Sequence, residues 1–237
     1  MATSNARKLL LDEGLRVVSE KGIRGLVVRE VAARAGVNLG SFVYHFGTRE
    51  KFAAELQELW YGPMYLKLKF AGEEDSSRTA LENLRVTLER LIELIRENAG
   101  FIRQLMADAL AGESAARSFL SEVPGRHPKL VLERVRMAQE EGAVMGGDPI
   151  QIMFFLFSSA AGPLIAAGML RGELDWLPPR TGEVLALLND PDAAKRRLGW
   201  ALKGVLAETS SGVEGDSAGP VRPHGESSSK MKFERSP

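Results

Sequence analysis

The sequence predicts an all-α protein, and three observations carry this prediction. Apolar residues recur at three- and four-residue spacings along most of the chain up to about residue 207. Glycine and proline punctuate these stretches at positions typical of helix ends. The chain shows no hairpin pattern, no alternation of strands with helices and no internal repeat.

Composition excludes several kinds of site. The 237 residues are 44% hydrophobic, which is enough for a packed core. Basic and acidic side chains number 31 each, so net charge gives no argument for nucleic-acid binding, and local distribution must supply one. The absence of cysteine excludes disulfides, thiolate nucleophiles and thiolate zinc sites, and it fits a cytoplasmic protein. The N-terminus MATSNARKLLLDEG lacks the apolar core of a signal peptide.

The N-terminal part is predicted to form four helices. They span residues 6–22, 28–36, 39–46 and 48–70. Gly22 stands where a helix C-cap is expected, and Thr48 is placed as the N-cap of the fourth helix. The Gly62-Pro63 pair is expected to bend or break that helix. The first helix has one apolar face, made of Leu10, Gly14, Val17 and Val18.

A polar, acidic joint at residues 72–77 (GEEDSS) divides the chain into a first unit, 1–71, and a second, 72–209. Further helices of the second unit are predicted at 77–98, 101–112, 114–123, 127–142, 150–170 and 190–209. The last of these begins at Asp190 or Asp192. Residues 210–237 are rich in serine, glycine and proline and are expected to be disordered.

The segment 150–170 carries no charge and is long enough to span a membrane. Its flanks argue against a span, because Asp148 precedes it, Arg171 and Glu173 follow it, and no interfacial tryptophan or tyrosine lies at its ends. We expect a helix buried by its own core on one face and by a second subunit on the other, with no membrane partner.

Residues 28–52, VREVAARAGVNLGSFVYHFGTREKF, have the form of a helix-turn-helix, in which the second helix enters the major groove of DNA. Gly36 can adopt the positive φ that the turn needs. Asn38 can cap the second helix and leave the N–H groups of Leu39 and Gly40 to a phosphate. The small residues Ala32, Ala33 and Ala35 let the two helices cross closely.

The second helix of this motif is predicted to bury Phe42 and Phe46, which leaves an exposed arc for DNA. Ser41 is assigned to a base edge or a phosphate, Leu39 and Val43 to thymine methyl groups, and Tyr44 and His45 to phosphates. Arg29 and Arg49 are placed to bind flanking phosphates. Further positive charge is expected from Arg7, Lys8, Arg16, Lys21, Arg24 and Arg34. The candidate DNA-binding residues are Arg29, Asn38, Leu39, Gly40, Ser41, Val43, Tyr44, His45, Thr48 and Arg49.

The pattern AxxAGVNxGSxxYHFGTREKF, set in four N-terminal helices ahead of a larger helical unit, resembles the TetR family of bacterial transcriptional regulators over residues 10–56. The resemblance implies that the first unit binds a palindromic operator, that the last two long helices form a dimer and that the body holds a small-molecule pocket. This chain departs from the family at Leu26-Val27, where hydroxyl residues are usual, at Val43, where an aromatic is common, and at Arg49, where lysine is usual.

Carried over to this chain, the resemblance places dimer helices at 148–170 and 190–207. The interface residues expected there are Ala160, Ala161, Leu164, Leu198, Ala201, Leu202 and Val205. An apolar or amphipathic effector is expected, because the candidate pocket residues are mostly apolar. Those candidates are Phe101, Met106, Met137, Met153, Phe154 and Phe157, with Arg103 or Gln104 as an orienting polar contact.

Enzyme signatures are missing from the sequence. The histidines are His45, His127 and His224, and none belongs to an HExxH pair, while GxxxxGK and GxSxG motifs do not occur. His127 lies in a proline-flanked joint and is expected in solvent. We therefore predict no catalysis, metal or cofactor, and a homodimeric, ligand-responsive repressor acting on double-stranded DNA. The alternatives are a helical membrane-associated or protein-interaction module without specific DNA binding, and a DNA-binding protein that answers to a protein partner or to its own tail.

Overall fold

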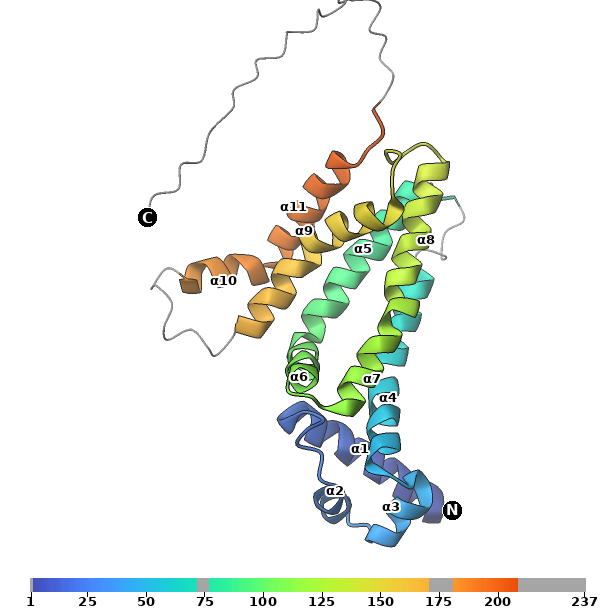
Figure 1. Ribbon diagram of the computed structural model, residues 1–237, viewed down its shortest axis with the longest axis vertical. Coiled ribbons are helices and arrows are strands. Elements are labelled where there is room, and N and C mark those ends of the chain that lie inside the picture. Colours follow the sequence, from blue (N-terminus) through green and yellow to red (C-terminus); the bar gives the residue numbers. More distant parts are fainter. Residues whose placement is uncertain (1, 72–76, 171–180, 209–237) are drawn as a thin grey trace, which may run out of the picture. The chain divides into compact units, whose positions relative to one another are not determined.

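The computed structural model describes residues 2–71, 77–170 and 181–208, and these residues are almost entirely helical (Figure 1). An isolated antiparallel bridge joins Val144 and Leu206, and no strand occurs in this part of the chain. The predicted all-α class is therefore confirmed. The α-helices are α1 (Ala2–Lys21), α2 (Val28–Arg34), α3 (Leu39–Phe46), α4 (Arg49–Ala71), α5 (Ala80–Glu97), α6 (Ala99–Leu110), α7 (Ser114–Glu122), α8 (His127–Glu140), α9 (Pro149–Leu170), α10 (Thr181–Asn189) and α11 (Pro191–Gly204), with a 3-10 turn η1 (Val123–Gly125) before α8.

Helices α1 to α4 pack around one apolar cluster. The predicted face of α1 is buried there, and Phe42, Phe46 and Phe52 fill the centre of the cluster. Gly14 has a specific task, because a Cβ at this position would lie 2.5 Å from Cζ of Phe52. Helices α1 and α4 can therefore approach this closely only with glycine at this crossing.

Helix α4 runs without interruption from Arg49 to Ala71, so the Gly62-Pro63 pair does not break it, and the alternative of a bend stays a prediction. Proline removes one backbone hydrogen bond from a helix interior. Here buried side chains on both sides, Tyr61 and Leu68, hold the flanking turns in the core. The helix thereby joins the first apolar cluster to the second.

The predicted division at residues 72–77 remains a prediction, since residues 72–76 lie outside the described part. Residues up to Ala207 form one compact unit. The predicted tail, 210–237, also lies outside the described residues.

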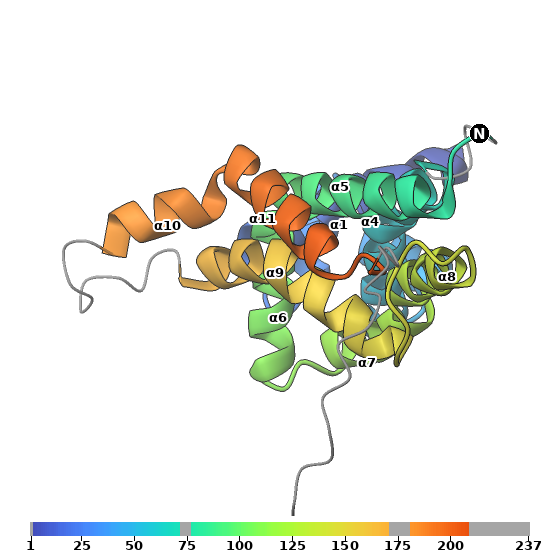
Figure 2. The same ribbon diagram turned by 90° about the horizontal axis from the view of Figure 1, so that it is seen from above.

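The larger cluster is built on α5, α8, α9 and α11, which lie together in the view from above (Figure 2). Helix α5 begins with a capping box in which the Thr79 side chain accepts from the Glu82 N–H and Glu82 accepts from the Thr79 N–H. Asp190 caps α11, as predicted, by accepting from the N–H groups of Asp192 and Ala193. Helix α10 had not been predicted.

Helix α9 is long and apolar enough to cross a membrane by length and composition over Pro149–Ala167, and 33% of that window is buried. Its buried side chains, Ile152, Leu156 and Leu164 among them, belong to the same cluster as α5 and α11. The core helix of a soluble protein meets the same criterion, so the length of α9 is weak support for a membrane span.

Candidate DNA-binding surface and ligand cavity

The turn between α2 and α3 has the geometry that the sequence predicts. Gly36 adopts φ of 67°, and the Asn38 side-chain oxygen accepts from the Ser41 N–H at 2.8 Å. Leu39 and Gly40 are exposed at the start of α3. The first turn of α3 is therefore capped at a surface position, with its positive end toward solvent.

Helix α3 presents the predicted arc. Phe42 and Phe46 are buried, whereas Leu39, Val43 and Tyr44 are 42%, 56% and 78% exposed. Ser41 and His45 are half-buried. Helices α2 and α3 lie at the opposite end of the compact unit from α11 (Figure 1). The arc is thus a surface that a DNA groove can reach, and the individual base and phosphate contacts remain predictions.

The expected belt of positive charge is largely neutralised within the protein. Arg34 pairs with Glu20 at 2.9 Å and with Glu13 at 3.3 Å, and its hydrogen bond lowers the pKa of Glu20. Arg29 is exposed and has no ion pair within the described ranges. The other paired cations are Arg7 with Glu55, Lys8 with Asp12, Arg16 with Glu13 and Lys21 with Glu30.

The Arg49 side chain has hydrogen-bond partners within the protein. Its Nε donates to the Leu26 carbonyl at 3.0 Å, Nη2 donates to the Ile23 carbonyl at 2.6 Å, and both terminal nitrogens contact Glu113 at 3.1 Å. The hydrogen bond from Arg49 is the main cause that lowers the pKa of the Glu113 carboxyl. The guanidinium is thus engaged by the residue just before α7 and by the turn before α2, and its predicted phosphate contact stays a prediction. Thr48 caps α4 as predicted, accepting from the Lys51 N–H at 3.2 Å.

A second carboxylate holds the same turn, and sequence reasoning missed it. Asp108 of α6 is fully buried and accepts from the N–H of Ile23 at 2.6 Å and of Arg24 at 3.4 Å. Gly22 has φ of 74°, and a Cβ there would lie 2.5 Å from the Asp108 carboxylate. Asp108 and Glu113 therefore tie the turn at residues 22–26 to α6 and α7.

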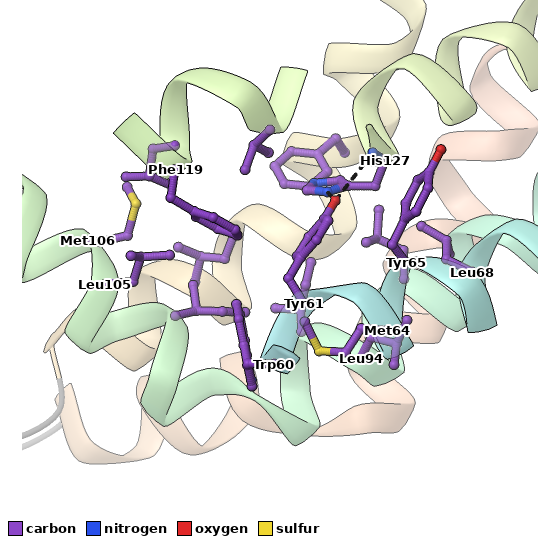
Figure 3. A pocket seen from close by; sticks show the side chains of 17 residues that line it. Trp60, Tyr61, Met64, Tyr65, Leu68, Leu94, Leu105, Met106, Phe119 and His127 are labelled. Carbon is purple, nitrogen blue, oxygen red and sulfur yellow. Dashed lines mark hydrogen bonds between the residues drawn. The ribbon is translucent and has the colours of Figure 1, made fainter. Parts of the chain in front are cut away.

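An apolar cavity of about 320 Å³ lies among α4, α5, α6, α7 and α9, close to the start of α8 (Figure 3). The predicted residues Met106 and Phe157 line it. Much of its wall comes from α4, which had been assigned to DNA binding alone. Those wall residues are Trp60, Tyr61, Met64, Tyr65 and Leu68. The signal that could have found them is the aromatic run WYGPMY at residues 60–65.

One polar pair stands in this cavity wall. The Tyr61 hydroxyl lies 2.7 Å from Nδ1 of His127, and Figure 3 shows the two side chains pointing toward one another. Burial raises the pKa of Tyr61 to about 12 and lowers the pKa of His127 to about 4. The expectation that His127 is solvated is therefore wrong, because Tyr61 draws the imidazole against the core.

The other predicted pocket residues lie elsewhere. Arg103 is exposed, and Phe154 is 59% exposed. Met137 lines a separate cleft beside Lys69 and Arg134, and Met153 packs on the large core cluster. Phe101 stacks on Trp60, with ring centroids 3.8 Å apart, and supports the wall without lining it. Helical spacing identifies apolar faces, but it does not indicate which face encloses a cavity.

The predicted dimer residues are corrected in the same way. Within a single chain they are already at most 4% exposed, so they form its own core. Among the side chains of α9 up to residue 167, the large apolar ones that remain exposed are Ile150, Phe154 and Phe155. Trp200 of α11 is 66% exposed, and Val184 and Leu187 of α10 are also exposed. The residues corrected here are Ala160, Ala161, Leu164, Leu198, Ala201, Leu202 and Val205.

Among the described residues, no group of three or more histidine, cysteine, aspartate or glutamate side chains is placed to hold a metal ion.

The chain is similar to known bacterial regulators. A family model described as bacterial regulatory proteins, tetR family, matches residues 10–56. The chain is 23% identical over 166 residues to the HTH-type transcriptional repressor DhaR of Mycobacterium sp. (strain GP1), which covers 70% of this chain and 83% of that protein. It is 23% identical over 152 residues to the HTH-type transcriptional repressor KstR2 of Rhodococcus jostii (strain RHA1), which covers 64% and 74%.

A solved tetR-family regulator from Mesorhizobium loti shares the fold, with a TM-score of 0.65 and 14% identity over 86% of this chain and 96% of that one. The matched residues 10–56 contain the capped turn and the exposed arc of α3. Residues 10–56 thus carry the DNA-binding part of the tetR family of bacterial regulatory proteins, and the chain is a DNA-binding transcriptional regulator rather than an enzyme.

Proposed function

We propose that this regulator is a homodimeric cytoplasmic repressor that leaves a palindromic operator when an apolar or amphipathic small molecule binds. The observation that carries the proposal is that α4 contacts α3 and also lines a cavity of about 320 Å³. Helix α3 belongs to a capped helix-turn-helix and presents the exposed arc. The exposed arc supports DNA reading, and the cavity supports an effector.

For DNA reading, each subunit would place residues 39–45 in a major groove. Two half-sites about 34–36 Å apart, or a multiple of that distance, would then be read by one dimer. Ser41, Leu39 and Val43 are proposed to contact bases, while Tyr44, His45 and Arg29 are proposed to contact phosphates. The N-terminal end of α3, with Asn38 and Gly40, would approach the backbone.

For dimer formation, we propose the exposed apolar faces of α9 and α11 in place of their buried faces. Phe154, Phe155 and Trp200 would cost free energy in water, and a second copy of the chain would cover them. This arrangement accounts for a helix that is apolar around its whole circumference, since one face is buried in the subunit and the other against its twin.

For ligand response, the carboxylates of Asp108 and Glu113 connect the cavity helices to the turn before α2. Leu105 and Met106 line the cavity, and Asp108 follows on the next turn of α6 and holds the turn at residues 22–26. Glu113, just before α7, holds the same turn through Arg49. A ligand that displaces α6 would bias the position of α2 and α3, because it binds one arrangement better than the other.

The test is a titration of compounds that raise the melting temperature of the protein against its complex with operator DNA. Release of DNA by such compounds supports the proposal. If every compound that binds leaves operator affinity unchanged, ligand response is excluded. Recovery of the protein only with membranes, instead of as a dimer in detergent-free buffer, would favour the membrane-associated alternative that the apolar α9 keeps open.

A further inference from the structure

Among the residues that the structure describes, none that lines the cavity is a lysine, arginine, aspartate or glutamate. Five aromatic side chains supply flat surface, and aliphatic residues and methionine supply most of the rest; the aromatic residues are Trp60, Tyr61, Tyr65, Phe119 and Phe157. A charged group placed here would lose its hydration without gaining a counter-ion. The cavity therefore favours molecules that are uncharged where the wall encloses them.

The Tyr61 and His127 pair determines which polar group faces the ligand. The Tyr61 oxygen accepts the His127 backbone N–H at 3.4 Å, so we assign the hydroxyl proton to the 2.7 Å contact with Nδ1. A neutral imidazole that accepts at Nδ1 carries its proton on Nε2. The depressed pKa of His127, about 4, keeps the ring neutral at physiological pH.

Two other side-chain polar groups stand in the wall, the Trp60 indole N–H and the Tyr65 hydroxyl, and Tyr65 also lines the neighbouring cleft. The Trp60 Nε1–H already donates to the Asn98 side chain at 3.0 Å. The Nε2 atom of His127 has no hydrogen-bond partner in the part of the chain that the structure describes. A half-buried donor of this kind gains free energy from a ligand that brings an acceptor.

We infer that the effector is an uncharged, largely hydrocarbon, ring-containing molecule with a hydrogen-bond-accepting oxygen, such as a ketone or ester carbonyl, which His127 Nε2 binds. This inference rests on the proposed effector role of the cavity and adds the chemical class and the recognising atom. Tyr61 acts as a positioning residue, because its hydroxyl holds the imidazole and selects the tautomer.

Three probes of one shape test this inference: 2-acetylnaphthalene, 2-isopropylnaphthalene and 2-naphthoate. Their dissociation constants are measured by equilibrium dialysis against the full chain without DNA, at pH 7.5. For each protein, the dissociation constant of the hydrocarbon is divided by that of the ketone, which gives the preference for the ketone. Comparing this ratio between the unmodified chain and its variants cancels the hydrophobic contribution of the shared ring system. We expect His127→Phe to reduce that preference about five- to tenfold, the value of one neutral hydrogen bond.

Tyr61→Phe should reduce the same preference by a smaller factor, since it releases Nδ1 and leaves the imidazole in place. If His127→Phe does not fold, Tyr61→Phe still tests whether His127 recognises the ketone. Met137→Leu, in the separate cleft, is the matched control and should leave the preference unchanged. 2-Naphthoate should bind at least about tenfold more weakly than the ketone to the unmodified chain.

An unchanged preference in both the His127 and Tyr61 variants would overturn the assignment of the recognising atom. Tighter binding of 2-naphthoate than of the ketone would overturn the uncharged class and direct attention to the cleft that Tyr65 shares with Lys69 and Arg126. Because no DNA is present, these results are separate from the proposed repressor function. A ketone that binds through His127 but leaves operator DNA bound would sustain the inference and contradict ligand response.

Discussion

At the scale of single residues, the arginines of the N-terminal unit differ in what they are free to bind. Arg29→Ala should weaken DNA binding on all sequences and reduce the slope of log affinity against log salt by about one, because one phosphate contact is lost. Arg49→Ala should leave that slope unchanged, since its guanidinium is bound to Glu113 and two carbonyls. Anisotropy titrations across a salt series measure both slopes.

The same Arg49→Ala variant should lower the free energy of unfolding by about 1–3 kcal/mol, because partly buried carbonyl and carboxylate groups lose their donor. Arg29→Ala should leave stability almost unchanged and serves as the control. A reduced salt slope for Arg49→Ala, with unfolding unaffected, would restore the phosphate role predicted from sequence. Urea denaturation measures the free energy of unfolding of both variants.

His127 gives a second prediction at this scale. Its pKa falls from 6.5 to about 4 in the folded protein, so between these pH values the unfolded chain binds a proton that the folded chain does not. Stability should therefore decline as pH falls from 6.5 to 4, by up to about 3 kcal/mol from this residue. The cause is burial of the imidazole, which penalises its charged form.

Urea unfolding at several pH values should show a flatter profile for His127→Phe than for the unmodified chain. The pKa of Glu113 is also lowered, so stability should fall at acid pH for this reason too. This second loss of stability should persist in both proteins and provides an internal reference. Identical profiles would show that His127 is solvated, as the sequence alone had indicated.

At the scale of the elements, α3 should divide into side chains that set sequence preference and side chains that set affinity. Ser41→Ala should change the ranking among operator variants, because its hydroxyl is assigned to a base edge. Tyr44→Phe should weaken binding by a similar factor on every variant, because its hydroxyl is assigned to phosphate. A panel of singly altered operators, titrated with both proteins, separates these outcomes. A uniform loss for Ser41→Ala would remove its base contact.

Helix caps and the buried face of α3 could be predicted from the sequence, whereas α10 could not. Caps are local, so Asn38 and Thr48 could be assigned from a few neighbouring residues. Burial of Phe42 and Phe46 follows from their spacing of one helical turn. Helix α10 could not be found this way, because Thr181–Asn189 is short and its apolar residues do not mark a narrow stripe.

The site was less predictable than the helices because it depends on contacts distant in sequence. Arg49 and Glu113 are 64 residues apart, and Ile23 and Asp108 are 85 apart. Nothing in the local pattern around Arg49 indicates that the Glu113 carboxylate, just before α7, will meet it. On α9 both faces are apolar, so the pattern predicts burial on both sides without indicating which side faces the chain's own core.

At the scale of the whole molecule, the dimer face is tested by charge. Phe154→Glu should shift the protein from dimer toward monomer, because a carboxylate would be buried at the proposed interface without a partner. Leu110→Glu, at a side chain that is 73% exposed on α6, is the matched control and should leave the mass unchanged. Sedimentation at several concentrations measures the change, and an unaltered dimer for Phe154→Glu would place the interface elsewhere.

The central claim is that this chain reads a specific double-stranded DNA site as a dimer. The most direct measurement is fluorescence anisotropy of the purified protein with DNA from upstream of its own gene, against scrambled DNA of the same composition, across a salt series. We predict tight, salt-dependent binding that is selective for the upstream DNA, with one dimer for each site. Weak binding that is equal on both DNAs, followed by no enriched sequence in a random-sequence selection, would contradict the claim.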